Sequence, residues 1–266
     1  MSSPTGPTPP PPPPPMYPVT SSPVAPEPAG PGLSEPQRLV DTFIAPSKTF
    51  TDIRRNASWW VPFLLISIFS ISFYVMIDKK VGFEQVARTM LASNKAIQQL
   101  APAQQEQAYA RTAIGLKVGE YAAPIFVLIL VLIVAAVLMA TFNFMMDAQV
   151  SFSQSMAIVM YGWLPGIVSA ILAMLALAFG DSEGFRMDNP IGTNPAHFLD
   201  PATTSKFVYA MLTSIDVISI WMIVLIGMGF ALNAKKKISM GSAIGAVAVW
   251  YFIVKLCGAG FAAMRG

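Results

Sequence analysis

Two charged side chains lie deep inside long apolar segments of the sequence, and they are the first candidates for chemistry. Asp216 lies in an apolar segment that runs to Leu232, and Lys255 lies in the next segment, which begins at Ser242. In hydrocarbon a charged side chain costs roughly 2.5–3.5 kcal/mol, and it usually faces a partner or a polar cavity. A carboxylate and an ammonium group at one depth can form an ion pair or pass a proton.

The spacing of the two charges predicts that they meet. A link of nine residues, 233–241, makes the two segments antiparallel neighbours. Asp216 lies 16 residues from Leu232 and Lys255 lies 13 from Ser242, so at about 1.5 Å per residue their depths differ by about 5 Å. No further acid or histidine continues the series. We therefore expect Asp216 and Lys255 to form an intramembrane ion pair that fixes helix register, and we favour this clasp over a proton or ion relay.

A third feature is a cluster of helix-disturbing residues inside another apolar segment. Gly162, Pro165 and Gly166 follow one another closely in Tyr161-Gly162-Trp163-Leu164-Pro165-Gly166. Proline removes a helix hydrogen bond and glycine permits close approach, so a kink is expected here. A broken helix can line a transport site, but kinked helices that only pack are far commoner.

Residues for other kinds of chemistry are sparse. A single cysteine, Cys257, excludes a disulfide framework, and a single histidine, His197, excludes a site with several histidine ligands. Asp181, Glu183 and Asp188 do not have the spacing of a calcium-binding loop and are expected to form a solvated acidic turn. No nucleophile elbow, phosphate loop or dinucleotide motif appears. We therefore predict no catalytic residue, no cofactor, no metal ligand and no enzymatic activity.

Composition indicates the kind of protein that must position these residues. Only 12% of residues are charged while 54% are hydrophobic, and the mean hydropathy is +0.57. A soluble protein with so little charge could not cover its surface with polar groups. The formal net charge of +3 is too small to suggest nucleic acid as a partner. The chain is expected to be an integral membrane protein in contact with the lipid bilayer.

Five apolar segments are long enough to cross a bilayer as helices, and the expected fold is therefore all-α. Each segment has 18 to 26 residues, against the roughly 20 that a span requires. They are 60–77, 121–146, 155–179, 207–232 and 242–264. Asp200 and Pro201 have the residue types of a helix start and are expected to begin the fourth helix outside the membrane.

The remaining segments divide the chain further. Residues 1–33 are rich in proline, including seven in a row from Pro9 to Pro15, and are expected to be disordered. Residues 34–58 are expected to form an amphipathic segment in the membrane interface, and 59–266 the five-helix membrane domain. The first loop, 78–120, has apolar residues at helical spacing and predicts one or two amphipathic helices that are broken near Pro102.

The basic residues predict an orientation. Lys235, Lys236 and Lys237 lie in the shortest basic link, and short loops count most in the rule that basic loops stay in the cytoplasm. With five spans this link lies on the same side as the N-terminus. We expect a cytoplasmic N-terminus in a multi-pass protein of the bacterial cytoplasmic membrane.

Several short motifs, taken in order with the five spans, resemble the Yip family of Ypt/Rab-interacting membrane proteins, in particular its bacterial members. The motifs are Phe43-x-x-Pro46-x-x-Thr49-Phe50, Ser151-Phe152-x-Gln154, Met160-Tyr161-Gly162-Trp163-Leu164-Pro165, Asn189-Pro190, Phe198-Leu199-Asp200-Pro201, Ser214-Ile215-Asp216 and Ile220-Trp221. The resemblance covers Arg38 to Met264 and implies five spans and a cytosolic N-terminus. Eukaryotic members bind small GTPases, but their Asp-Leu-Tyr-Gly-Pro signature is missing here, so the resemblance does not extend to GTPase binding.

Two functions fit the sequence. We favour a non-enzymatic membrane protein that organises the membrane or binds partner proteins, either other proteins or further copies of itself. The alternative is a small transporter or channel component. Many secondary transporters consist of two matching halves, and an odd number of spans without an internal repeat does not favour that class.

Overall fold

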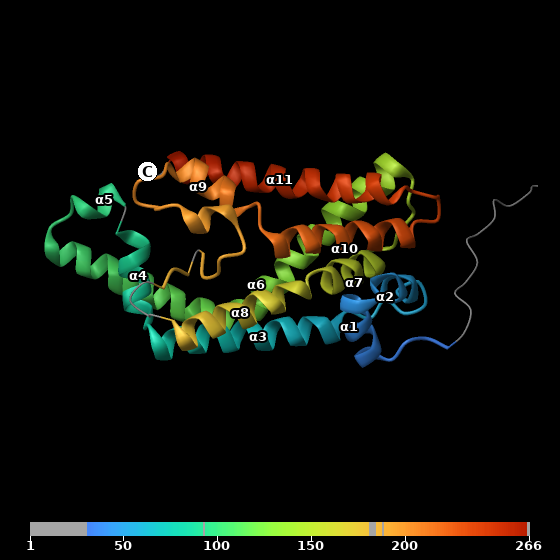
Figure 1. The fold of residues 1–266 in the computed structure, drawn as a ribbon, viewed down its shortest axis with the longest axis horizontal. Helices are drawn as coiled ribbons and strands as arrows, with labels where there is room; N and C mark the ends of the chain where they lie inside the picture. The colour runs from blue at the N-terminus through green and yellow to red at the C-terminus, as the bar shows by residue number, and fades with distance from the viewer. Residues whose placement is uncertain (1–30, 93, 181–184, 188, 265–266) are drawn as a thin grey trace, which may run out of the picture.

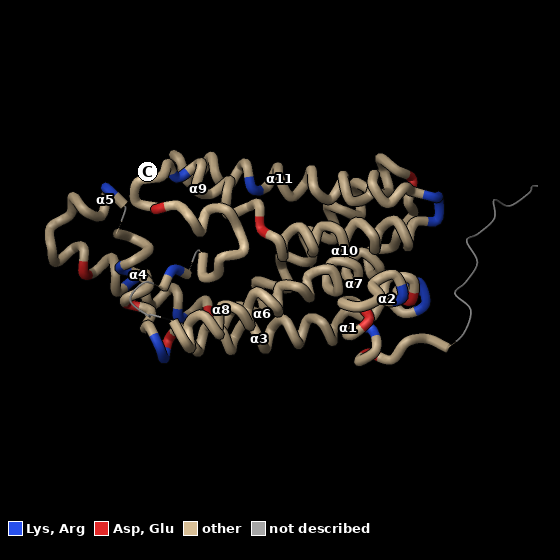
Figure 2. Tube along the Cα trace, viewed as in Figure 1, with Lys and Arg blue, Asp and Glu red and all other residues tan. Residues whose placement is uncertain are grey.

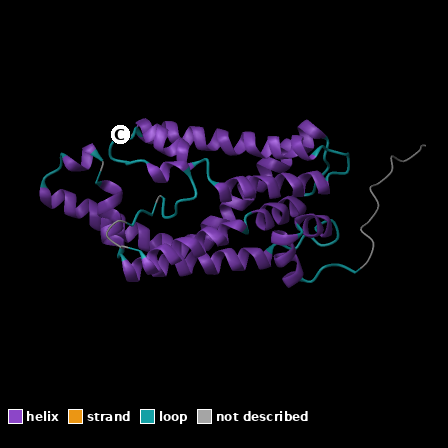
Figure 3. Ribbon diagram, viewed as in Figure 1, coloured by secondary structure: helices purple, strands orange, loops and turns teal. Residues whose placement is uncertain are grey.

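A computed structural model describes residues 31–92, 94–180, 185–187 and 189–264. Within these ranges the regular structure is helical, without strands (Figure 3). Most of the proline-rich segment and the acidic residues Asp181, Glu183 and Asp188 lie outside the described residues. The expectations for them therefore stay predictions.

Two short helices form a cap at one end of the molecule. Helix α1 (Glu35–Ile44) begins with a capping box, in which the Ser34 hydroxyl accepts a hydrogen bond from the Gln37 amide. Helix α2 (Pro46–Asp52) follows directly because Pro46 cannot continue α1 but fits the first turn of a new helix. The cap buries Phe50 and Ile53 completely and leaves Val40 and Ile44 exposed on its outer side.

The next helices build one layer of the bundle. They are α3 (Trp60–Lys80), α6 (Pro102–Met146), α7 (Phe152–Gly162) and α8 (Pro165–Phe179). A second capping box, Ser151 with Gln154, begins α7. At the far end of the molecule, α4 (Phe83–Leu91) packs its buried Phe83, Val86 and Ala87 against this layer, followed by α5 (Lys95–Gln98).

Helix α6 differs from the expectation in its length. Pro102 begins a helix of 45 residues that runs without interruption into the second apolar segment. At about 1.5 Å per residue this helix is about 68 Å long, more than twice the roughly 30 Å of hydrocarbon. Its polar first half therefore projects beyond the membrane, where it supports α4 and α5 (Figure 1).

The last helices form the other layer, and here the sequence prediction was partly wrong. The fourth apolar segment is divided into α9 (Lys206–Thr213) and α10 (Val217–Asn233), which meet at an angle of 54°. Asp200 and Pro201 do not start a helix, because residues 200–203 form a turn in which Asp200 accepts from the Ala202 amide. Ser205 caps α9 instead. Helix α11 (Met240–Met264) is continuous.

The described part of the chain contains four helical segments long and apolar enough to cross a membrane, or five if the bent pair α9–α10 is one span. The two layers are held together by apolar packing, including Phe142 of α6 stacked on Phe230 of α10 at 4.2 Å between ring centres. Gly229 lets Ile158 and Phe50 approach the backbone of α10 closely. The chain is thus a polytopic membrane protein with an all-helical core.

Charged residues gather toward the two ends of the molecule, and few lie between (Figure 2). The end that holds α1 and α2 also holds the link between α10 and α11. The guanidinium of Arg54 donates to the carbonyl of Leu232, and the Lys235 amide donates to the carbonyl of Ala148 at 2.9 Å. The cap, Arg54 and the Lys235–Lys237 link therefore share one end.

Candidate functional site

The most unusual local feature of the bundle is the break between α9 and α10. Asp216 is the N-cap of α10: its Oδ1 accepts from the Ser219 amide at 2.9 Å, and its Oδ2 accepts from the Thr193 hydroxyl. An aspartate at this position satisfies amides that the start of a helix leaves unpaired. The carboxylate is thus held by two hydrogen bonds and by the electrostatics of the helix start.

Residues 189–194, which form no helix, pack against the break and bind to the residues on both sides of it. The Val217 amide donates to the Thr193 carbonyl at 3.2 Å. In the same segment Asn189 and Asn194 donate to each other's side-chain oxygens at 3.3 and 2.8 Å. Asn189 also donates to the hydroxyl of Tyr209 on α9 at 3.2 Å. These contacts fix the segment to both halves of the broken helix.

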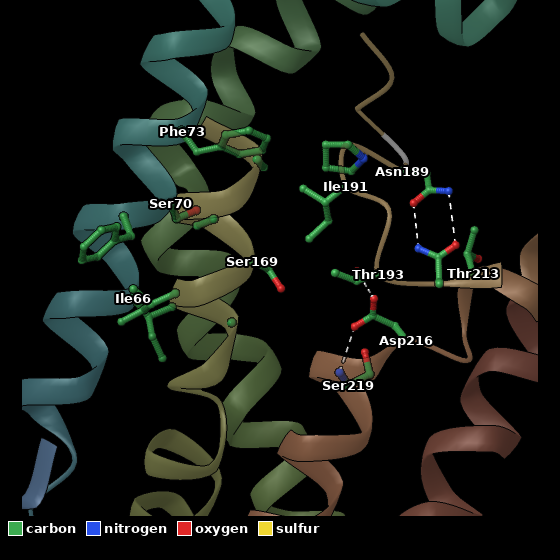
Figure 4. Close-up of a pocket in the computed structure, with 17 residues that line it drawn as sticks. Ile66, Ser70, Phe73, Ser169, Asn189, Ile191, Thr193, Thr213, Asp216 and Ser219 are labelled. Atoms are coloured by element: carbon green, nitrogen blue, oxygen red, sulfur yellow. Dashed lines mark hydrogen bonds between the residues drawn. The ribbon is translucent and has the colours of Figure 1, made fainter. Parts of the chain in front are cut away.

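The break opens on a cavity of about 420 Å³ between α3, α8 and the α9–α10 junction (Figure 4). One wall is apolar and includes Ile66 and Phe73 of α3. The opposite wall is polar, with Asp216 directed into the space between the helices and Ser169 facing it from α8 (Figure 4). A polar cavity in an apolar bundle is expensive unless polar groups satisfy one another or a ligand.

The structure does not bring Asp216 and Lys255 into an ion pair. The ammonium of Lys255 lies over the ring of Tyr251, 5.4 Å from its centre, and Lys255 is exposed on α11. The hydroxyl of Tyr251 in turn donates a hydrogen bond at 2.9 Å to the carbonyl of Ser214, which lies in the break between α9 and α10. The depth estimate treated the fourth segment as one straight helix, whereas the bend places Asp216 at a helix start with partners of its own. The ion pair stays a prediction.

The predicted kink residues lie where the third span is interrupted. Helix α7 ends at Gly162 and α8 begins at Pro165. The Trp163 amide donates to the carbonyls of Val159 and Met160, and the Leu164 amide to Tyr161, so the turn tightens rather than opens. Gly162 faces Ile226 of α10 so closely that a larger residue would clash, and Gly166 lines the cavity.

A second polar cluster, which we call the cap network, fixes the cap to the bundle. Arg38 is 1% exposed and its Nε and Nη2 donate to one oxygen of Asp52 at 2.7 and 2.6 Å. The hydroxyls of Thr42 and Thr49 donate to the Arg38 carbonyl. Across the interface, Tyr161 of α7 donates to Glu35 at 2.8 Å. The polar face of the cap is thus turned inward.

The guanidinium of Arg38 stays protonated although it is buried. Desolvation alone would lower the pKa of the guanidinium, but its hydrogen bonds to Asp52 and Tyr161 outweigh that effect and raise the pKa. The group therefore stays a cation, and its pairing with Asp52 is needed to keep a buried charge compensated.

Sequence reasoning missed the cap network and the role of Thr193. Tyr161 lies 126 residues from Glu35, so no local pattern reports the contact. The available signal was Arg38 itself, a cation within the capped helix on the opposite side from Val40 and Ile44. Thr193 gave no signal, because a threonine in a turn-rich segment is ordinary.

Comparison with known families decides what kind of chain this is. A family model described as the Yip1 domain matches residues 40–260. The chain belongs to the Yip1-domain family. No curated protein and no solved structure matches it. The comparison gives the family without a bacterial branch, so the bacterial assignment stays a prediction.

The motifs that suggested the Yip family take part in the contacts that shape the fold. Phe43 packs edge-on against Trp221 at 5.6 Å between ring centres. Thr49 bonds the Arg38 carbonyl, and Tyr161 bonds Glu35. Asp216 caps α10. In this Yip1-domain protein these residues fix helix breaks and the cap, and Asp216, like Asn189 and Pro190 of another motif, also lines the cavity.

Proposed function

We propose that this Yip1-domain protein is a non-enzymatic membrane organiser that binds a partner protein at its basic end. The observation that carries the proposal is the cap, whose polar contacts with the bundle turn it into a fixed platform. Asn233 at the end of α10 donates to the Phe50 carbonyl at 2.8 Å, and Arg54 donates to Leu232. Because the platform is already ordered, less conformational entropy is lost when a partner binds to its surface.

The chemistry of the platform favours an acidic partner on the cytoplasmic side. Lys48 is exposed on α2, and Lys235, Lys236 and Lys237 are exposed in the neighbouring link. Clustered cations attract acidic surfaces and accelerate encounter with them. The same lysines favour retention of this end in the cytoplasm. The exposed Val40 and Ile44 face the lipid interface beside it.

Site-specific photo-crosslinking in cells tests the proposal. A photoreactive residue at Lys48 is expected to capture a protein partner, and the yield is expected to fall at high ionic strength. The same residue at Thr203, which is exposed near α9 far from the cap, is the matched control. Equal capture at both positions, or no capture at Lys48, would contradict binding at the basic end. Capture of a second copy of the chain would identify the partner as the protein itself.

A second candidate function is movement of a small solute, and the cavity at the α9–α10 break is the observation that favours it. Broken helices whose ends face a polar cavity build binding sites in many transporters. Flux measurements on the purified protein in proteoliposomes test this candidate. Uptake above that of empty vesicles supports it, and uptake unchanged by Asp216→Asn contradicts transport through this cavity.

A further inference from the structure

The cavity at the break lies close to the middle of the bundle's apolar thickness. Ser70, which lines it, is the eleventh residue of the 21 in α3. Tyr251, which bonds the Ser214 carbonyl beside the break, is the twelfth of the 25 residues in α11. Water and headgroups do not reach this depth on the outside of a span. Polar groups here are therefore satisfied by protein or by something bound.

Several polar groups of the cavity wall are not fully used by the protein. The hydroxyls of Ser70 and Ser169 form no hydrogen bond within the described part of the chain, and both line the cavity (Figure 4). Each carboxylate oxygen of Asp216 accepts one hydrogen bond, although a carboxylate offers about four acceptor sites. Acceptor capacity therefore remains on a charged group that faces a space lined with further hydroxyls.

The electrostatics of the site favour a positive ligand. Among the described residues that line the cavity, Asp216 carries the only charge. The negative end of the α9 helix dipole points toward the same break, and the positive end of α10 lies there too, where Asp216 caps it. Lys255 lies over the ring of Tyr251 and Arg186 over the ring of Tyr209, and neither residue lines the cavity.

The volume of the cavity and its apolar wall further limit the kinds of ligand that fit it. A volume of about 420 Å³ is too large for a bare metal ion and lies in the lower range of small-molecule sites. Phe69 and Phe73 of α3 line the wall; aromatic rings attract ammonium groups and also accept alkyl chains.

We propose that the cavity binds a small organic ammonium compound. Its positive nitrogen contacts the carboxylate of Asp216, and its carbon chain lies against α3. The ammonium group can belong to a free amine or to the ethanolamine headgroup of a membrane lipid. The site goes beyond the proposed role of the basic end. It refines the second candidate function, but binding does not require that the ligand cross the bilayer. A binding assay and the flux assay can therefore fail independently.

The test measures the thermal unfolding midpoint of the purified full-length chain, followed by tryptophan fluorescence, while n-butylamine is titrated. A ligand that binds only the folded state raises the midpoint with its concentration. We expect a saturable rise with butylamine and none with 1-butanol, which has a similar size and no charge. The same rise with both compounds would overturn the charge recognition, and no rise with butylamine in lipid free of ethanolamine headgroups would overturn the site.

Two pairs of variants place the binding in this cavity. Asp216→Asn removes the charge but keeps a residue that caps helices well, and it is expected to weaken butylamine binding at least tenfold. Its control, Asp200→Asn, removes an exposed charge outside the cavity and should bind like the wild type. Ser169→Met fills the cavity and should abolish binding, whereas Ala178→Met on the exposed face of α8 should not. Unchanged binding in Ser169→Met overturns the proposal even if Asp216→Asn does not fold.

The source of the ammonium group is distinguished by the lipid. In nanodiscs of phosphatidylglycerol the butylamine response should be full. If phosphatidylethanolamine occupies the cavity, discs that contain it should raise the wild-type midpoint without butylamine and suppress the response, and Asp216→Asn should lose both effects. If the response persists in those discs, a free amine is the ligand. Either result supports the ammonium site, whereas a response that Asp216→Asn leaves unchanged in both kinds of disc overturns it.

Discussion

Arg38 shows at the scale of single residues how this protein uses polar groups in an apolar bundle. Its guanidinium is buried and shares two hydrogen bonds with one oxygen of Asp52, and its carbonyl accepts from two threonines. Such a pair contributes little compared with well-packed apolar residues, but removing one partner leaves an uncompensated charge. The pair therefore determines which cap conformation is allowed more than how stable the fold is.

The first prediction concerns this pair. Asp52→Leu should destabilise the protein by up to about 3–5 kcal/mol, because Arg38 then stays buried with only the partly exposed Glu35, 3.8 Å from its Nη1, as a counter-charge. The double variant Arg38→Met with Asp52→Leu should recover most of that loss. Lys48→Met, an exposed cation on the same cap, should change stability by less than about 0.5 kcal/mol. Chemical or thermal unfolding in detergent measures all three, and a double variant as unstable as Asp52→Leu would contradict the role of the pair.

A second prediction concerns Gly227, where the backbone of α10 closely approaches that of α11. A Cβ at this position would lie 2.6 Å from the Cα of Ile244, which is a backbone atom that cannot rotate away. Gly227→Ala should therefore lower stability by about 1–3 kcal/mol, as overpacking does. Gly245→Ala on α11 meets nothing within 4 Å and is the matched control. Equal unfolding midpoints for the two variants would show that the helices can separate without cost.

At the scale of helices and links, local chemistry explains what the sequence could predict. The capping boxes at Ser34 and Ser151 involve residues three positions apart, so each was visible in the sequence and each is present. The prediction that Asp200 and Pro201 begin a helix was wrong, because the same residue types also favour turns and here a turn forms. Long apolar spans were predictable from hydropathy alone, which the bilayer makes a strong constraint.

The break at Asp216 could not be predicted, because hydropathy averages over about 18 residues while the break involves three. It depends on Thr193, which comes from a segment outside the spans and bonds both the Asp216 side chain and the Val217 amide. The cavity has the same origin, since its walls come from distant segments. The sequence indicated Asp216 as a candidate site residue, but not its partners.

The predicted pairing of Asp216 with Lys255 is decided by a double-mutant cycle on thermal stability. Pairing predicts that Asp216→Asn and Lys255→Met each destabilise and that the double variant recovers much of the loss. This requires Lys255 to leave the ring of Tyr251, where it lies in the structure. Losses that add within about 0.5 kcal/mol would show that the two charges do not interact.

At the scale of the whole molecule, the bundle is expected to fold without its proline-rich start. The composition of residues 1–33 offers no apolar surface that could offset the entropy of ordering them. Deletion of residues 1–30 should therefore leave membrane insertion and the unfolding midpoint unchanged. Membrane fractionation and thermal unfolding measure this. Failure of the shortened chain to accumulate in the membrane would show that the segment is structural.

The central claim is that the bent pair α9–α10 is one complete span, so that the chain crosses the membrane five times with the cap and the Lys235–Lys237 link in the cytoplasm. Thr203 precedes α9 and Ser239 precedes α11, and both are exposed. Single cysteines at these positions, in a Cys257→Ala background, can be labelled with an impermeant maleimide on intact cells. The account predicts labelling at Thr203→Cys and protection of Ser239→Cys until the membrane is permeabilised. Equal labelling of both positions in intact cells would show that α9–α10 is a re-entrant loop. Labelling of Ser239→Cys alone would show that the protein has the opposite orientation in the membrane.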